Sequence, residues 1–402
     1  MLVLAHDPDQ LAIISVRAKQ FRFRMRPARV IHLIENLNRG AVENWLLRML
    51  RHARKQRIEV DWTFYCISDE PGRLENDARN LGATIIRSPV SIGNKIGFIR
   101  ALRCELRRGK YNVLHTHHDL ISAVYLVAAI GTQIRRRIVH VHNADEQVLT
   151  PNHFKQCLYR EPLRRTCFWM ADRIVGNSNH TLDTFLAGRA RHSARDIVHY
   201  YGVDATPFQN AKGNRGEFRR KLGLREDASI ILFAHRMVPE KNPLFAVDVL
   251  QAMHRIDGTI AGVFAGSGSL HQPVLQRVAQ HGLSAAFRNL GWRDDIAEVM
   301  SCCDWFILPH PERALEGFGL AVVEAQLAGL RLLLSRGVAD DPLLPTARFR
   351  RLSLWDDANV WANAAMELLK ESAPCRRSAL GALNRSPFEM NTALAGLLAL
   401  HG

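Results

Sequence analysis

The chain has 402 residues, more than one hydrophobic core usually organises, so we expect two domains. With 47% hydrophobic and 23% charged residues, the composition is that of a globular protein and excludes a largely disordered, fibrous or collagen-like chain. The formal net charge is +15, and 45 of the 54 cationic residues are Arg, which favours an anionic partner. Codon bias in a GC-rich genome is an equally open explanation for the excess of Arg over Lys.

The cysteines and the apolar segments indicate a cytoplasmic compartment. Seven Cys form no Cys-x-x-Cys pair and have no His at zinc-site spacing, so we interpret them as reduced core thiols. His6, Asp7 and Asp9 interrupt any signal-peptide core, and no apolar run reaches the length of a membrane span. We expect a cytoplasmic protein, with at most peripheral contact to the inner face of a membrane.

Residues 1–28 stand apart as an N-terminal extension. The segment is basic and aromatic (RAKQFRFRMRPAR) and has neither a helical nor a strand period. A short arm that binds an anionic membrane surface is the functional interpretation. Met25 would also make a natural start, so whether residues 1–24 belong to the natural protein stays open.

From Arg29 onward, short β-branched runs alternate with longer amphipathic ones. In the first half the predicted strands include RVIHLI, VDWTFYCIS, NVLHTH, RIVHVHN and RIVGNS, with helices near 95–108 and 151–171. Residues 203–227 are polar and read as a connection. A second βα series then contains SIILFAH, TIAGVFAG, FRNLG, WFILPH and RLLLS, and residues 356–400 are helical. This rhythm predicts an α/β protein of two doubly wound, Rossmann-like domains that face an inter-domain cleft.

Three segments at the ends of predicted strands contain candidate binding residues. Gly40 lies between a strand and a helix, where free N–H groups suit an anion, although a glycine that only permits the turn fits as well. Arg236 and Lys241 follow the first strand of the second domain and could clamp a diphosphate, or could be solvated loop cations. Glu316 and Glu324 are separated by seven intervening residues, which include a Gly-Phe-Gly turn that precedes a helix.

The segment LEGFGLAVVEAQLAG resembles the Glu-x7-Glu motif of the retaining family 4 glycosyltransferases, which have the GT-B fold. NRGAVENWLL, HVHN, YYGVDATPF, HRMVPEKN, AGSGSL and LGWRDDIAEVMSCCDWFILP are similar to family segments in the same order, over about residues 29–340. FEMNTALAGLLALH is similar to the closing helix of the family. The resemblance implies an N-terminal acceptor domain over 29–205, a nucleotide-sugar domain over 206–385, and a helix over 386–402 that packs back on the first domain.

The resemblance also implies roles for individual residues in the second domain. Glu324 would hold the ribose of a nucleotide sugar, Glu316 would bind the donor sugar, and Arg236 with Lys241 would neutralise the diphosphate. The remaining donor-binding positions would be Gly266 and the backbone N–H groups of Phe318, Gly319 and Leu320.

In the first domain, the resemblance implies that Gly40 would let its loop approach the donor phosphates or the acceptor, and that His142 would contact the reacting sugar. The implied reaction is a metal-independent hexosyl transfer with retention from a UDP- or GDP-sugar to a glycan or polyprenyl-linked acceptor, in surface-polysaccharide synthesis. We expect no cofactor and no metal site, and no nucleic-acid partner.

Some positions depart from the family pattern. His235 and Ala41 stand where Gly is common, and Arg331 replaces a Pro. A catalytically silent nucleotide-sugar-binding scaffold therefore stays open, as does another GT-B enzyme such as an epimerase or a sucrose-type synthase. His115 and His117 alternate at a strand end with no second cluster at ligand spacing along the chain, so a metal site there is not favoured.

Aromatic and acidic residues elsewhere receive structural interpretations. Core positions are preferred over sugar stacking for Trp45, Trp169, Trp292 and Trp305. The pair Asp294-Asp295 is interpreted as helix-capping carboxylates and not as a metal site.

Overall fold

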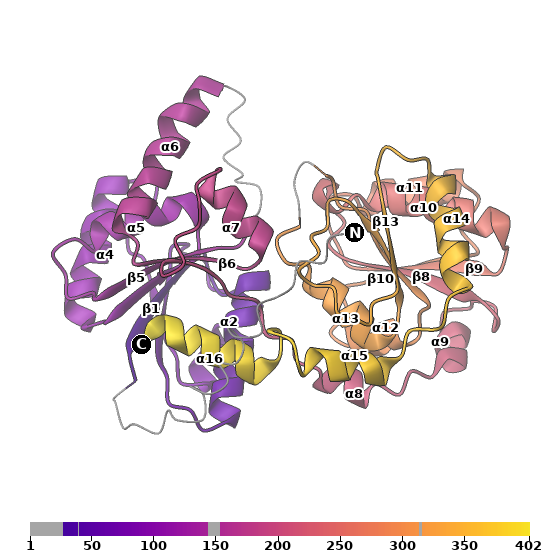
Figure 1. The fold of residues 1–402 in the computed structure, drawn as a ribbon, viewed down its shortest axis with the longest axis horizontal. Coiled ribbons are helices and arrows are strands. Elements are labelled where there is room, and N and C mark those ends of the chain that lie inside the picture. Colours follow the sequence, from indigo (N-terminus) through magenta and orange to yellow (C-terminus); the bar gives the residue numbers. More distant parts are fainter. Residues whose placement is uncertain (1–26, 39, 144–152, 313–315) are drawn as a thin grey trace. The chain divides into compact units, whose positions relative to one another are not determined.

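A computed structural model describes residues 27–38, 40–143, 153–312 and 316–402. The chain divides into two compact units, of which the second is Val203–Ser386. The first unit contains the residues up to Gly202 together with Pro387–Gly402, so its last helix comes from the far end of the sequence (Figure 1). The predicted arm within residues 1–26 lies outside the described residues.

The first unit is a seven-stranded sheet in the order β3-β2-β1-β4-β5-β6-β7, and all of its strand pairs are parallel. Its strands are β1 (Arg29–Ile34), β2 (Asp61–Cys66), β3 (Thr84–Arg87), β4 (Val113–Thr116), β5 (Arg136–Val141), β6 (Arg173–Gly176) and β7 (Asp196–Val198). Its α-helices are α2 (Ala41–Lys55), α3 (Glu75–Asn80), α4 (Lys95–Gly109), α5 (Ser122–Ala128), α6 (His153–Met170), α7 (Asn179–Leu186) and α16 (Met390–His401).

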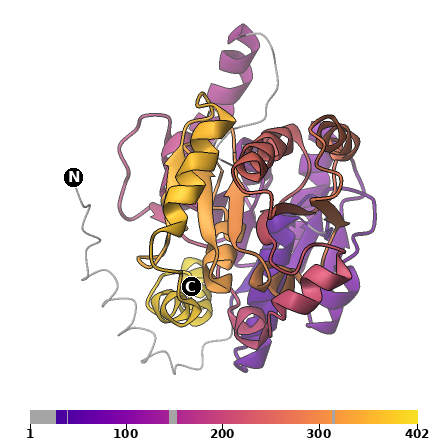
Figure 2. The same ribbon diagram turned by 90° about the vertical axis from the view of Figure 1, so that its right-hand side faces the viewer.

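The second unit is a six-stranded parallel sheet in the order β10-β9-β8-β11-β12-β13. Its strands are β8 (Ser229–Ala234), β9 (Ile260–Ala265), β10 (Phe287–Gly291), β11 (Trp305–Leu308), β12 (Arg331–Ser335) and β13 (Phe349–Leu352). Its α-helices are α8 (Thr206–Asn210), α9 (Arg215–Lys221), α10 (Pro243–Ile256), α11 (His271–Gln280), α12 (Ile296–Ser301), α13 (Leu320–Ala328), α14 (Ala358–Leu369) and α15 (Arg376–Leu383). Figure 2 shows the same elements from the side.

The two faces of the first sheet differ in chemistry. Alternate residues of a strand point to opposite faces, and one face buries Ile31, Leu114 and Val139 against α4, α5 and α6. The other face presents His32, His115 and neighbouring histidines toward α2 and α16, which pack together.

Helix ends are fixed by ordinary capping. Ser178 accepts a hydrogen bond from the N–H of Thr181 at 3.0 Å to start α7, and Asn94 accepts one from the N–H of Gly97 at 3.0 Å to start α4. Pro243 occupies the first turn of α10, where its fixed φ favours a helix.

The structure confirms the α/β class and the two parallel, Rossmann-like sheets. It also corrects the interpretation of the cysteines, since Cys104 on α4 and Cys375 before α15 are exposed free thiols, whereas Cys66, Cys167 and Cys303 are buried. Cys104 lies on the solvent-facing side of α4 and Cys375 lies directly before α15, and the spacing of cysteines along the chain does not reveal either exposure. Strand β13 is a further element that the sequence did not predict.

Within the part of the chain that the structure describes, none of the helices combines the length and the hydrophobicity that crossing a membrane would require.

Candidate active site

The chain adds β9 and β10 on one side of β8, and β11, β12 and β13 on the other side, so the strand order reverses between β8 and β11. Strand β8 leads into α10, which packs with α14, whereas β11 leads into α13, which packs with α12 and α15. The loops that follow these adjacent strands therefore leave toward opposite faces of the sheet. In open α/β sheets, ligands bind in the crevice that such diverging loops create at the carboxyl edge. Residues 235–242 belong to the first of these loops, and residues 309–312 and 316–319 belong to the second.

An ion pair between Lys241 and Glu316 joins these two loops. Only 14% of the Lys241 side chain and 18% of the Glu316 side chain are exposed. The Nε2 atom of His310 lies 3.5 Å from the Glu316 carboxylate. Burial by itself would raise the pKa of Glu316, but electrostatic interactions, first with Lys241 and then with His310 and His235, overcome burial and lower it to about 2. The Glu316 carboxylate is therefore ionised at neutral pH.

The backbone holds Glu316 in place from the other side. Its N–H donates to the carbonyl of Gly337 at 2.8 Å, and the residue forms a parallel bridge with Val338. Three residues later, Gly319 caps α13 with φ +74°, a left-handed conformation that favours glycine. Glu324 follows on α13 as a half-buried residue. The motif thus spans a loop carboxylate, a glycine turn and a helix.

The other predicted positions of this motif surround the start of α13. Phe318 is buried, and Leu320 is the first residue of the helix. On the opposite loop, Arg236 is exposed, whereas the Nε2 atom of His235 is buried without a hydrogen-bond partner. Burial, followed by the charge of Lys241, lowers the pKa of His235 to about 3, so this imidazole is neutral.

Gly266 is required by close packing between two loops. It follows β9 with φ +149°, and a Cβ atom on it would lie 1.9 Å from the carbonyl oxygen of His235. Gly268, with φ +157°, would clash in the same way with the carbonyl oxygen of Met237. The two glycines let the loop after β9 touch the loop after β8, which places the backbone of Gly266 beside the predicted donor-binding residues.

Gly40 differs from these glycines. Its φ is −80°, which any residue adopts, and it stands directly before α2. The side chain of Glu43 folds over it, so that a Cβ atom on Gly40 would collide with the Glu43 carboxylate. Burial raises the pKa of Glu43 to about 7. Ala41 is exposed, so its methyl group does not fill the turn.

His142 is buried in the first unit with partners on both ring nitrogens. Its Nε2 atom lies 2.9 Å from Nδ1 of His117, and its Nδ1 atom lies 2.6 Å from the hydroxyl of Tyr201. Its backbone N–H donates to Asp119 at 2.9 Å. Its predicted contact with a sugar remains a prediction.

The structure reveals a group of buried histidines that sequence reasoning missed. This histidine patch covers the α2 and α16 face of the first sheet and consists of His32, His115, His117, His140, His142, His199 and His401. Burial lowers the pKa of each one, to about 3 for His142 and His401, so the rings are neutral. No second histidine cluster is apparent along the chain, because the partners of His115 and His117 come from other strands and from the last helix. The alternation His-x-His in two predicted strands was the available signal.

Two further interpretations are corrected. Trp169 and Trp292 are 85% and 51% exposed, while Trp45 and Trp305 are buried in the core as expected. Asp295 stands at the N-cap of α12, but its carboxylate pairs with Arg293 and makes no cap hydrogen bond. A neighbouring guanidinium competes with the helix N–H groups for this carboxylate.

Two glycosyltransferase family models match consecutive parts of the chain. Residues 42–207 match Glycosyltransferase Family 4, and residues 214–338 match Glycosyl transferases group 1. EpsF of Bacillus subtilis (strain 168), a protein named as a glycosyltransferase, is 25% identical over 353 residues, which cover 87% of this chain and 89% of EpsF. An Escherichia coli UDP-Gal:alpha-D-GlcNAc-diphosphoundecaprenol alpha-1,3-galactosyltransferase is 26% identical over 238 residues, 57% of this chain and 59% of that enzyme.

A solved structure has the same fold. HepE from Anabaena, crystallised with UDP, superposes with a TM-score of 0.74 at 16% identity and covers 92% of this chain and 98% of HepE. The two family models follow one another in the order of the two domains, and together they span most of the chain. The chain is therefore a glycosyltransferase of the GT-B type, in which residues 42–207 are similar to Glycosyltransferase Family 4 and residues 214–338 are similar to Glycosyl transferases group 1.

Proposed function

We propose that the protein transfers a hexose from a UDP- or GDP-sugar to a glycan or polyprenyl-linked acceptor, with retention of configuration and without a metal ion. The observation that carries this proposal is the Lys241–Glu316 ion pair between the two loops that diverge from β8 and β11. A cation and a carboxylate there can bind the two unlike ends of a sugar diphosphate, because one end is anionic and the other carries hydroxyl groups.

Binding of the donor would redistribute this pair. Lys241 would leave Glu316 for the diphosphate, with the exposed Arg236 as a second cation, and Glu316 would accept hydrogen bonds from the sugar hydroxyls. Glu324 on α13 would accept hydrogen bonds from the ribose. As the glycosidic bond breaks, negative charge grows on the leaving diphosphate, and cations already in position stabilise that charge without a metal ion.

A thermal-shift screen with UDP, GDP and ADP and their sugars, in EDTA, tests the donor class. One nucleotide family should raise the melting temperature, because a ligand that binds only the native state stabilises it. Glu324→Gln should weaken donor binding in calorimetry at least tenfold, whereas Glu298→Gln on α12 should leave it unchanged. If no nucleotide raises the melting temperature, the transferase proposal fails. Binding with no turnover on any acceptor would support the silent scaffold.

The acceptor and the stereochemistry need separate measurements. The Escherichia coli relative is named for a diphosphoundecaprenol-linked acceptor, which supports a lipid-linked acceptor and a role in surface-polysaccharide synthesis. NMR of the first product formed in EDTA should show an anomeric configuration equal to that of the donor. An inverted product, or activity that returns only with Mg²⁺, would contradict the proposal.

Contact with an anionic membrane surface would bring the protein to such an acceptor. Helix α6 extends beyond the sheet of its own domain in both views (Figures 1 and 2) and exposes Leu158, Tyr159, Arg165 and Trp169. Exposed aromatic and cationic side chains together suit a membrane interface. Trp169→Ser should reduce sedimentation with phosphatidylglycerol vesicles, whereas Trp355→Ser, at an 83% exposed position of the second domain, should not. Equal losses would contradict docking through α6.

A further inference from the structure

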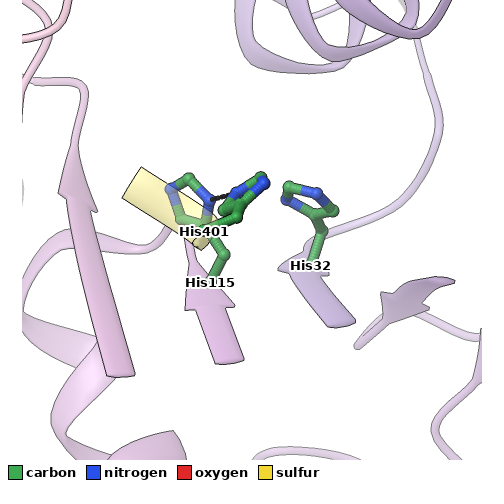
Figure 3. A group of neighbouring side chains, drawn as sticks. All are labelled: His32, His115 and His401. Atoms are coloured by element: carbon green, nitrogen blue, oxygen red, sulfur yellow. Dashed lines mark hydrogen bonds between the residues drawn. The ribbon is translucent and has the colours of Figure 1, made fainter. Parts of the chain in front are cut away.

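We propose that His32, His115 and His401 form a binding site for one divalent transition-metal ion, best suited to Zn²⁺, which fastens α16 to the first sheet. The three residues come from β1, β4 and α16, and their rings lie side by side (Figure 3). Each offers one ring nitrogen, these nitrogens all lie within 4.8 Å of one another, and the three side chains are buried. None of them is among the predicted donor-binding residues.

The separation of one pair of these nitrogens is close to that of metal ligands. Nδ1 of His115 lies 3.0 Å from Nε2 of His401. Two imidazole nitrogens on a tetrahedral zinc ion, at bond lengths of about 2.0–2.1 Å, are about 3.4 Å apart. If the rings of His115 and His401 moved slightly apart, a metal ion could therefore replace the hydrogen-bonded proton between them.

The ring orientations favour this trio over the overlapping trio of His115, His117 and His140. An imidazole lone pair lies in the plane of its ring, so rings converge on one ion when their planes cross. The His401 plane makes angles of 71° with His32 and 76° with His115, whereas the His32 and His115 planes differ by 35°. In the other trio, His115 is stacked with His140 at 7° and with His117 at 27°. Lone pairs in stacked planes do not meet at one point.

The hydrogen bonds around the trio also suit a bound ion. Nε2 of His32 is buried without a partner, and an ion would supply one. A metal-bound imidazole carries its proton on the other nitrogen and donates it to a neighbour. Here Nδ1 of His32 lies 3.1 Å from Nε2 of His117, and Nε2 of His115 lies 3.2 Å from Nδ1 of His140. The outward N–H groups of His32 and His115 would thus each have an acceptor, whereas Nδ1 of His401 is buried without a hydrogen-bond partner.

The donor set selects the ion. Three imidazoles with no carboxylate suit Zn²⁺ and related transition metals and not Mg²⁺ or Ca²⁺, which prefer oxygen ligands. A water molecule would complete a tetrahedral zinc site. Because His401 belongs to a helix more than 280 residues away in sequence from His115, the ion would cross-link distant parts of the first domain.

Metal analysis of the untagged full chain tests the proposal. After dialysis against Zn²⁺ and then metal-free buffer, the wild type should retain about one zinc ion per chain. His32→Leu and His401→Leu should retain less than a tenth of that amount. His192→Leu, at an exposed histidine of the same domain, should retain it in full. Zinc should raise the melting temperature of the wild type and of His192→Leu only.

A spectroscopic measurement keeps the test independent of variant folding. X-ray absorption at the zinc edge of the wild type should give imidazole nitrogens at about 2.0 Å. Substoichiometric zinc with no change in melting temperature would overturn the proposal. Zinc that is retained in His32→Leu and His401→Leu but lost in His117→Leu would assign the ion to the other trio and would also overturn it.

Discussion

The Lys241–Glu316 ion pair should be a major contributor to the stability of the second domain. Lys241→Met keeps the aliphatic stem but removes the charge, which leaves a carboxylate that is 18% exposed without its strongest partner. The pKa of Glu316 is lowered from 4.5 to about 2, a shift that corresponds to about 3 kcal/mol at neutral pH. We therefore expect Lys241→Met to reduce the free energy of unfolding of this domain by about 3 kcal/mol.

The pH dependence follows from the direction of the shift. The folded-state pKa lies below the unfolded value, so the stabilisation is complete above pH 4.5 and is lost as the pH falls toward 2. Urea unfolding at pH 7 and at pH 3, with a probe in the second domain, should show a difference between wild type and Lys241→Met that is much smaller at the lower pH.

A double-mutant cycle and a surface pair supply the controls. Glu316→Gln should suppress most of the cost of Lys241→Met, because no unpaired carboxylate then remains. Lys370→Met breaks a pair with Glu367 in which the side chains are 72% and 59% exposed, and it should cost less than about 1 kcal/mol. If Lys241→Met costs no more than Lys370→Met, or if Glu316→Gln does not suppress it, the reasoning is refuted.

Three further changes should separate packing from charge. Acidification from pH 7 to 5 should lower the free energy of unfolding by about 2 kcal/mol through His235, because its folded pKa of about 3 lies below its unfolded value. In urea unfolding at the two pH values, His235→Asn should remove this part of the pH dependence. Gly266→Ala should lower the melting temperature strongly through the clash with a carbonyl oxygen, whereas Gly258→Ala, with nothing within 4 Å, should be nearly neutral; equal effects would contradict the steric argument. Asp304→Asn should cost about 3 kcal/mol in chemical unfolding, because it removes the charged partner of the buried Arg219, and a cost below 1 kcal/mol would contradict this.

The sequence was informative where a feature is local. Hydrophobic period and composition were enough to predict the apolar strands β8 and β11 and the glycine turn before α13. The alternation of strands with helices was enough to predict a parallel sheet. The exposure of Trp169 was not predictable, because a single aromatic residue on an amphipathic helix does not reveal which face is buried. The partnership of Lys241 with Glu316 needed the adjacency of β8 and β11, which only topology supplies.

Long-range assembly was the least predictable part. His32 and His115 are 83 residues apart and His401 follows His115 by 286 residues, and no spacing rule along a chain joins them. Strand β13 is short and carries two arginines, so its polar sequence did not read as a strand.

The return of residues 387–402 to the first domain constrains the order of events during synthesis. The second domain, Val203–Ser386, is continuous and has all of its strands once residue 386 has left the ribosome. The first domain is translated earlier, yet the sheet face that carries the histidines lacks α16 until the last residues emerge. The domain that is made first is therefore completed last, and a chain that ends at residue 386 would have a finished second domain and a first sheet whose histidine-bearing face is covered by α2 but lacks α16.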